Sequence, residues 1–286
     1  MNGRELAQAF RDGKQTFGTA VLSPSPKWVS IVKGAGLDFV FIDTEHTPMD
    51  REKVAWMCEA FRAVGVVPIV RIPVPDPFLA TMALDAGALG VVGPYVETAS
   101  QITALRGAVK CRPLKGQRLE AFLNGESDLA PETKAYLAEA NRDNLLIVNI
   151  ESTPALENLE NLVNTPGLDG VFVGPHDLSI SLGVPEDYGH PTFLAAVEKI
   201  IVACRKAQVG VGIHLGAGDP IQLQIEWAEM GANILVHSSD IRLFAQGIQR
   251  DFIRFREATG TRNANAADSN GDHAGRSSIP TRDGNV

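Results

Sequence analysis

LLIVNIE at residues 145–151 and LDGVFVGPHDLS at residues 168–179 decide the fold of this chain. Each stretch runs through consecutive apolar residues, as a strand buried on both faces of a parallel sheet does. Each also presents one carboxylate, Glu151 or Asp177, just past its last apolar position. A helical pattern at 155–163 lies between the two stretches. The sequence therefore predicts a strand–helix–strand unit with an acid at the carboxyl end of each strand.

The same alternation of short apolar runs and amphipathic stretches continues along most of the chain. Eight runs predict strands, at residues 18–22, 37–43, 66–72, 90–95, 145–151, 170–174, 210–215 and 233–237. Helical patterns lie between them, among others at residues 51–64, 78–86, 155–163, 192–206 and 220–230. Eight strand–helix alternations in about 250 residues are typical of a single α/β domain, the (β/α)8 TIM barrel. An open doubly wound sheet is the alternative, but the sequence lacks the GxGxxG and GxxxxGKS/T fingerprints of nucleotide-binding sheets.

Two segments break the alternation. Residues 110–144 form a long polar connection after the fourth strand, and a connection of this length in a compact domain is typical of a lid or an interface element. Residues 260–286 hold almost no large apolar side chain, which predicts a disordered tail. We therefore expect one barrel domain over residues 1–259 and a tail over residues 260–286.

The composition is that of a globular protein that can bury a sizeable core, because 44% of its 286 residues are hydrophobic and 21% are charged. A net charge of −8 without a basic cluster argues against nucleic acid as a partner. No apolar run approaches membrane-spanning length, which argues against a membrane. The three cysteines, Cys58, Cys111 and Cys204, lie far apart, and the N-terminal segment is too polar for a secretory signal. We expect reduced, buried thiols in a cytoplasmic protein.

Polar residues collect at the carboxyl ends of the predicted strands, where the active sites of barrels lie. Along the chain they are Asp43, Glu45, His46, Arg71, Glu151, Asp177, His214 and His237. Desolvating an unpaired carboxylate is costly. Glu151 and Asp177, at neighbouring strand ends, therefore indicate a site for a hard divalent cation such as Mg²⁺ or Mn²⁺. The alternative is that both acids cap the helices that follow them.

His46 follows Asp43 by three residues in a loop between a strand and a helix. A carboxylate this close can fix the imidazole tautomer and raise its basicity, which favours an acid–base role for His46. Asp85, before the fourth strand, is a second possible partner of this group. Arg71 ends an apolar strand, where its planar fork suits a carboxylate or a developing oxyanion. Alternatively, Arg71 pairs within the chain with Asp43 or Asp85, and both roles are compatible.

Five motifs taken in order resemble those of the HpcH/HpaI family of class II pyruvate aldolases: FVFIDTEHTPMD, PIVRIP, LDAGALGVVGPYVET, IVNIES and GVFVGPHDLSISLG. The likeness runs from Phe17 to Phe255. It implies a metal-dependent (β/α)8 barrel that assembles as a homo-oligomer, either a hexamer built from trimers or a trimer. It also implies reversible retro-aldol cleavage of a 4-hydroxy-2-oxo acid to pyruvate and an aldehyde. The implied cofactor is Mg²⁺, Mn²⁺ or Co²⁺.

The resemblance also implies catalytic roles for matching residues. Glu151 and Asp177 would hold the divalent metal. His46 would be the acid–base residue, oriented by Asp43 with Asp85 nearby. No lysine occurs at a predicted strand end, so the chemistry would not use a Schiff base.

On the substrate side, the resemblance implies that Arg71 contacts the pyruvyl oxygen and that the backbone at Gly174 and Pro175 helps to seat the pyruvate carboxylate. Three positions depart from the family pattern, namely Asn149 for a glutamine, Leu119 for a glycine and His214 for an apolar residue. We expect Asn149 to change a contact behind the first metal ligand. We expect His214 to add a polar contact to the aldehyde, and the segment around Leu119 to shape the aldehyde side of the pocket.

Two alternatives remain. A CoA-thioester lyase of the citrate lyase β or malyl-CoA type would use the same enolate chemistry, but it needs a basic surface for the CoA phosphates, and this acidic chain shows none. A non-catalytic oligomeric binding protein with a vestigial site is the other. Retention of both carboxylates, the histidine and the arginine argues against it.

Overall fold

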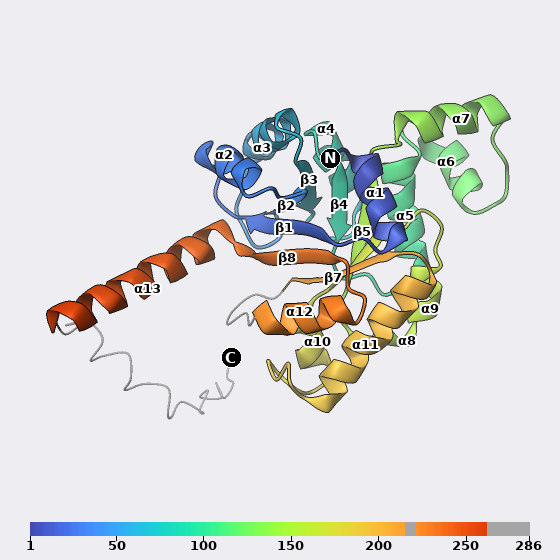
Figure 1. The fold of residues 1–286 in the computed structure, drawn as a ribbon. Coiled ribbons are helices and arrows are strands. Elements are labelled where there is room, and N and C mark those ends of the chain that lie inside the picture. The colour runs from blue at the N-terminus through green and yellow to red at the C-terminus, as the bar shows by residue number, and fades with distance from the viewer. Residues whose placement is uncertain (215–220, 262–286) are drawn as a thin grey trace, which may run out of the picture. The chain divides into compact units, whose positions relative to one another are not determined.

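Eight parallel strands close into a barrel in the order β1 to β8, with β8 paired to β1 (Figure 1). The computed structural model describes residues 1–214 and 221–261. The strands are β1 (Thr16–Val21), β2 (Phe39–Asp43), β3 (Val67–Arg71), β4 (Gly90–Gly93), β5 (Leu145–Ile150), β6 (Gly170–Val173), β7 (Gly210–His214) and β8 (Ile234–Ser239). The predicted barrel is confirmed, and each predicted strand overlaps an observed one.

Side chains alternate between the inside and the outside of the barrel along each strand, as the strand period of two requires. On β2, Phe39 and Phe41 belong to the cluster inside the barrel, whereas Val40 and Ile42 belong to the larger cluster between strands and helices. The next inward position on this strand is Asp43, at its carboxyl end. The register of the strands therefore directs the strand-end residues into the barrel mouth.

Helices follow the strands and cover their outer faces (Figure 1). They include α2 (Lys27–Gly34), α3 (Arg51–Ala63), α4 (Pro77–Asp85), α5 (Ala99–Lys110), α8 (Thr153–Glu157), α9 (Leu159–Val163), α10 (Pro175–Ser181), α11 (Pro191–Lys206) and α12 (Ile221–Glu229). Asp50, Asp76 and Thr98 begin α3, α4 and α5, because their side chains accept hydrogen bonds from first-turn N–H groups. The single helix predicted at 155–163 is two short helices, and Asn158 ends the first and begins the second.

Helix α1 (Gly3–Asp12) closes the amino-terminal end of the barrel. Its Leu6 and Phe10 are fully buried in the cluster inside the barrel. Gly210, at the start of β7, makes room for this helix, since a Cβ there would lie 2.8 Å from the Cβ of Phe10. Just before β8, Asn233 Nδ2 donates to the carbonyl of Phe10 (3.0 Å). The carboxyl ends of the strands therefore form the open end of the barrel.

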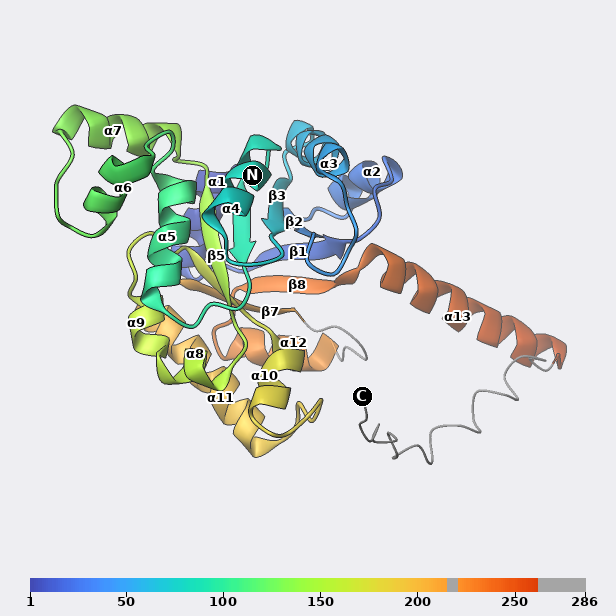
Figure 2. The same cartoon turned by 180° about the vertical axis from the view of Figure 1, so that it is seen from behind.

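The connection predicted at residues 110–144 contains two helices, α6 (Gly116–Leu123) and α7 (Pro131–Ala140), and α6 packs against α5 (Figure 2). The sequence indicated only a polar connection because α6 buries no residue and α7 buries only Leu137, which leaves little apolar periodicity. Gly107 on α5 admits the side chains of α6, since a Cβ there would lie 2.8 Å from Leu123 and 3.2 Å from Leu119. Within one chain, Leu119 is thus a packing residue of this helical pair.

The chain divides into two compact units, Met1–Ile241 and Arg242–Val286. The described part of the second unit is the continuation of α13 (Asp240–Thr259), which exposes apolar side chains such as Phe244 and Phe252. The tail predicted over residues 260–286 lies outside the described residues from position 262 onward. Among the helices of the described ranges, none combines the length and the apolar character that crossing a membrane requires.

Candidate active site

A cavity of about 540 Å³ opens at the carboxyl ends of the strands. Phe41 and Phe172 line its inner part, and their rings meet edge to face with centroids 5.7 Å apart. Asp43, Arg71 and Asn149 each lie two positions beyond an apolar residue that faces inward. Because side chains alternate along a strand, these three polar side chains also face inward and line the cavity. The strand period thus carries three of the predicted site residues into one cavity.

Arg71 and Asp43 form a bidentate ion pair between neighbouring strands. Arg71 Nε donates to Asp43 Oδ1 (2.9 Å) and Nη2 donates to Oδ2 (2.7 Å), and the guanidinium lies 5.3 Å from the centroid of Phe41. Burial opposes the charge on Asp43, but the hydrogen bonds and charge of Arg71 outweigh burial and hold the pKa of Asp43 below its ordinary value. Burial also opposes the charge on Arg71, yet Asp43 keeps the pKa of Arg71 above its ordinary value. The intrachain pair that the sequence left open is present.

The imidazole of His46 does not pair with Asp43, contrary to the prediction. The backbone N–H of His46 donates to Asp43 Oδ1 (3.4 Å), whereas the ring Nε2 lies 3.8 Å from Glu45 Oε2 and the side chain is 64% exposed. The physical reason is that Arg71 already occupies both oxygens of Asp43. His46 nevertheless lines the cavity.

Glu45 has a buried side chain. The sequence indicated that it lies at the end of this strand, but no role was predicted for it. Its Oε2 lies 3.1 Å from Arg71 Nε, and this oxygen has no hydrogen bond of good geometry within the described part of the chain. A hydrogen bond between Tyr95 and Glu45, followed by burial, raises the pKa of Tyr95 to about 12. One guanidinium therefore faces two buried carboxylates, those of Asp43 and Glu45.

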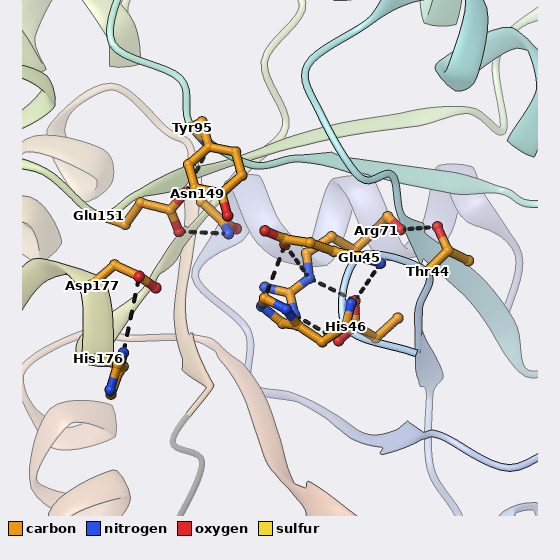
Figure 3. A network of polar contacts seen from close by, with 10 residues as sticks. Thr44, Glu45, His46, Arg71, Tyr95, Asn149, Glu151, His176 and Asp177 are labelled. Atoms are coloured by element: carbon orange, nitrogen blue, oxygen red, sulfur yellow. Dashed lines mark hydrogen bonds and ion pairs between the residues drawn. The ribbon is translucent and has the colours of Figure 1, made fainter. Parts of the chain in front are cut away.

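Glu151, directly after β5, has its carboxylate held by two hydrogen bonds (Figure 3). The backbone N–H of Tyr95 donates to Oε1 (2.7 Å), and Asn149 Nδ2 donates to Oε2 (2.9 Å). Tyr95 adopts a left-handed backbone conformation, with φ of 54°. Gly174 leaves the space that the carboxylate fills, since a Cβ there would lie 2.6 Å from Glu151 Oε2. Burial, and then the charge of Asp177, raise the pKa of Glu151 against the effect of these hydrogen bonds.

Asp177, in the first turn of α10, lies beside Glu151 in the cavity (Figure 3). The two acids supply the oxygen donors that hard divalent cations prefer. Their mutual repulsion, which contributes to the raised pKa of Glu151, is what a bound cation would relieve. Within residues 1–214 and 221–261, no group of three or more His, Cys, Asp or Glu side chains could hold a metal. The two acids fit a cation whose remaining positions are filled by water and substrate.

Asp85 does not lie near His46 within one chain, contrary to the prediction. It ends α4, and that helix runs back toward the start of β4, so Asp85 lies at the opposite end of the barrel from the cavity. Its exposed carboxylate pairs with Arg112, which follows α5.

Gly174 and Pro175 line the cavity, but neither provides a backbone donor there. The N–H of Gly174 donates to the carbonyl of Ile150 (3.2 Å), and proline has no N–H. These two residues therefore contribute shape and space to the cavity.

The two histidines predicted at the ends of the seventh and eighth strands are His214 and His237. His214 ends β7, and its side chain lies outside the described residues. His237 follows the inward-facing Val236 and so points outward, where its Nδ1 lies 2.8 Å from Gln224 Oε1 on α12. His237 is therefore no part of this cavity.

Three residues of the cavity wall that carry polar groups were not predicted, namely His176, Glu186 and Tyr188. His176 lies in the first turn of α10, next to Asp177, so the motif that contains both could have indicated it. Glu186 and Tyr188 belong to the loop after α10. A loop residue follows no apolar strand, and the sequence alone gives no signal of where its side chain points.

The sequence model of the family described as HpcH/HpaI aldolase/citrate lyase matches residues 17–234. The chain is 31% identical over 246 residues to a 2-keto-3-deoxy-L-rhamnonate aldolase of Klebsiella pneumoniae, with 85% of this chain and 90% of the relative covered. It is 34% identical over 226 residues to a 2-dehydro-3,6-dideoxy-6-sulfogluconate aldolase of Pseudomonas putida, with 79% and 87% covered. Among solved structures, an HpcH/HpaI aldolase of Desulfitobacterium hafniense superposes with a TM-score of 0.77 at 25% identity, and 90% of this chain and 99% of that chain are covered.

Proposed function

The chain belongs to the HpcH/HpaI aldolase/citrate lyase family and is an aldolase, and we propose that its cavity cleaves a 4-hydroxy-2-oxo acid reversibly to pyruvate and an aldehyde. The observation that carries this proposal is the meeting of Glu151 and Asp177 with the Arg71–Asp43 pair in one cavity. Retro-aldol cleavage needs a site that stabilises the negative charge left on pyruvate. A pair of acids suited to a cation, together with a buried guanidinium, supplies that stabilisation.

Glu151 and Asp177 would hold the divalent cation, which we expect to be Mg²⁺, Mn²⁺ or Co²⁺. When bound, the cation supplies Lewis-acid stabilisation of the charge that develops on the keto oxygen as the C3–C4 bond breaks. Asn149 and the backbone N–H of Tyr95 orient the carboxylate of Glu151 for this purpose. Gly174 keeps the adjacent space free of a side chain.

Arg71 would add positive charge beside the same keto oxygen. Asp43 engages its Nε and Nη2, which fixes the guanidinium plane and leaves the third nitrogen, Nη1, outside this pair. The ring of Phe41 supports the guanidinium from one face. Because the guanidinium is held before substrate binds, it does not have to reorganise as the charge develops.

His46 would accept the proton of the C4 hydroxyl in cleavage and return it in synthesis. Its ring lines the cavity and is exposed enough to reach a substrate. Glu45, whose Oε2 lies 3.8 Å from Nε2, is the carboxylate that faces the ring. Among the described residues, no lysine lines the cavity that could form a Schiff base.

The oligomeric state and the cellular location of the protein stay predictions. We expect a hexamer or a trimer, which light scattering of the purified protein measures, and a cytoplasmic location. The CoA-thioester alternative has less support, because Asp177 and Glu186 on the cavity wall would repel the CoA phosphates.

Pyruvate release from a panel of 4-hydroxy-2-oxo acids tests the proposal, measured with Mn²⁺ and then with excess EDTA. We expect the wild type to release pyruvate with Mn²⁺ and to stop in EDTA. Glu151→Ala should lose this activity, while Glu160→Ala, which removes an exposed acid on α9, should retain it. A metal-replete wild type that releases no pyruvate from any substrate would overturn the proposal.

A further inference from the structure

A second cavity, of about 500 Å³, lies between α5, the connection that holds α6 and α7, and the loop that leads into β6. Helices α6 and α7 lie on the outer side of α5 (Figure 2). The loop contributes Pro166 and Gly167, just before β6 begins. Because the start of a strand lies at the amino-terminal end of the barrel, this cavity is at the opposite end from Glu151 and Asp177. The chemistry proposed above gives it no role.

The wall of this second cavity carries cations and, among the described residues, no acid. Its charged members are Arg106, Lys110, Lys134 and Arg142. Such a wall contrasts with the whole chain, which has 34 acidic and 26 basic residues. The sequence did not indicate this cluster, because its members are spread over residues 106–142 and come together only when α7 lies beside the end of α5. A wall of this sign selects for anions.

Three of these four cations are already neutralised by acids behind the wall. Lys110 pairs with Asp169, Lys134 with Asp128 and Arg142 with Glu139. A ligand gains little from a cation that an acid has neutralised, and these acids repel a ligand of high charge. The wall therefore lacks the several free cations that the phosphates of CoA would need, and the CoA-thioester alternative gains no support from it.

Arg106 differs from the other three, because it makes no ion pair within the described part of the chain. Its half-buried guanidinium lies 5.8 Å from the centroid of the Phe122 ring. Its stem packs against Gly167, where a Cβ would lie 3.1 Å from Arg106 Cγ and Cδ. Burial raises the pKa of the neighbouring Cys111 against the charge of Arg106, so this thiol stays neutral and does not compensate that charge. Arg106 is therefore a cation held in place without a counter-ion.

We propose that this second cavity binds a small organic acid that has one carboxylate and an apolar body. The planar fork of Arg106 matches the two oxygens of a carboxylate. Phe122, Leu129 and Leu137 line the same cavity and offer the apolar body a surface. One cation without a counter-ion balances one negative charge, which favours a monocarboxylate over a phosphate monoester. The volume lies within the range of small-molecule sites.

Four probes test the proposal in ligand-observed NMR titrations of the full chain: benzoate, benzamide, acetate and phenyl phosphate. Benzamide removes the charge of benzoate, acetate removes the apolar ring, and phenyl phosphate adds a second charge. We expect benzoate to bind most tightly, by about tenfold or more over benzamide, the effect of a hydrogen bond between charged groups. Arg106→Gln should weaken benzoate binding by about the same factor. Arg118→Gln is the matched control, because Arg118 is an exposed arginine on α6 that does not line the cavity.

A second pair of variants changes the shape of the cavity and none of its charges. Ala138 and Ala135 are both exposed on α7, but only Ala138 lines the cavity. Ala138→Trp should therefore abolish benzoate binding by filling the space, and Ala135→Trp should retain it. Pyruvate release should be unchanged in Arg106→Gln, so the two proposals stand or fall separately.

Four results would overturn the proposal. They are no binding of benzoate at millimolar concentration, equal affinity for benzoate and benzamide, tighter binding of phenyl phosphate than of benzoate, and a benzoate affinity that neither Arg106→Gln nor Ala138→Trp lowers.

Discussion

Replacing Arg71 by methionine is expected to lower both stability and turnover. In the native protein Arg71 pairs with both Asp43 and Glu45, and the three side chains are 13%, 7% and 8% exposed. Methionine keeps an apolar stem over Phe41 but removes the charge, so two buried carboxylates lose their partner. Removing one partner of a buried ion pair costs about 3–5 kcal/mol. Turnover should fall by about 10²–10³-fold, the usual loss when one oxyanion donor is removed.

For a chain of this size, each kcal/mol lowers Tm by about 2–4 °C. The Tm of Arg71→Met is therefore expected to fall by roughly 6–20 °C. Arg71→Lys keeps the charge but cannot donate two parallel hydrogen bonds to Asp43, so it should lose about 1.5–3 kcal/mol. A bidentate pair therefore predicts that the wild type is the most stable, Arg71→Lys is intermediate and Arg71→Met is the least stable.

Urea unfolding of the wild type, Arg71→Met, Asp43→Asn and the double variant measures the coupling. Asp43 has already lost its partner in Arg71→Met, so Asp43→Asn should cost at least about 2 kcal/mol less in that background. Additive effects of the two substitutions would refute the reasoning. A loss below about 1 kcal/mol for Arg71→Met would refute it too.

Three further predictions follow from the site and the core. Because Arg71 holds the pKa of Asp43 low, this carboxylate stabilises the fold above its unfolded pKa of about 3.9, and the contribution is lost as pH falls through the lower folded value. The stability difference between wild type and Asp43→Asn in urea should therefore be constant from about pH 5 to 8 and should close below about pH 4. Gly174→Ala should displace the carboxylate of Glu151 and weaken Mn²⁺ binding about tenfold or more in calorimetry, whereas Gly34→Ala, where a Cβ meets nothing within 4 Å, should not. Burial raises the pKa of Cys58 to about 12, so a thiol reagent at pH 8 should leave it unmodified in the native protein and modify it in urea.

The strands and their order could be predicted because each is a run of apolar residues bounded by polar ones. The burial of Cys58, Cys111 and Cys204 as free thiols was also predicted correctly. Helices α6 and α7 could not be predicted, because helices that bury almost nothing carry little periodicity. The break at Asn158 also gave no signal, since the apolar pattern continues across it.

At the site, the sequence indicated which strand ends carry polar residues but not how those residues pair. Arg71 donates a hydrogen bond to each oxygen of Asp43, and the ring of His46 lies beside Glu45 instead. This pairing depends on side-chain geometry, which the sequence does not reveal. The position of Asp85 could have been deduced, because a residue at the end of a helix that leads into a barrel strand lies at the amino-terminal end of the barrel. Glu186 depends on a loop conformation that the sequence does not reveal.

Helix α1 closes the amino-terminal end of the barrel with Leu6 and Phe10, and this closure has a consequence for the kinetics. With the lower end of the barrel filled, both products of cleavage share a single exit. With the pyruvyl half beside the buried Glu151, the aldehyde half would lie nearer to the mouth of the cavity. We therefore expect ordered release, with the aldehyde departing before pyruvate. Pyruvate should inhibit cleavage competitively against the substrate, and the aldehyde should inhibit it in a mixed fashion.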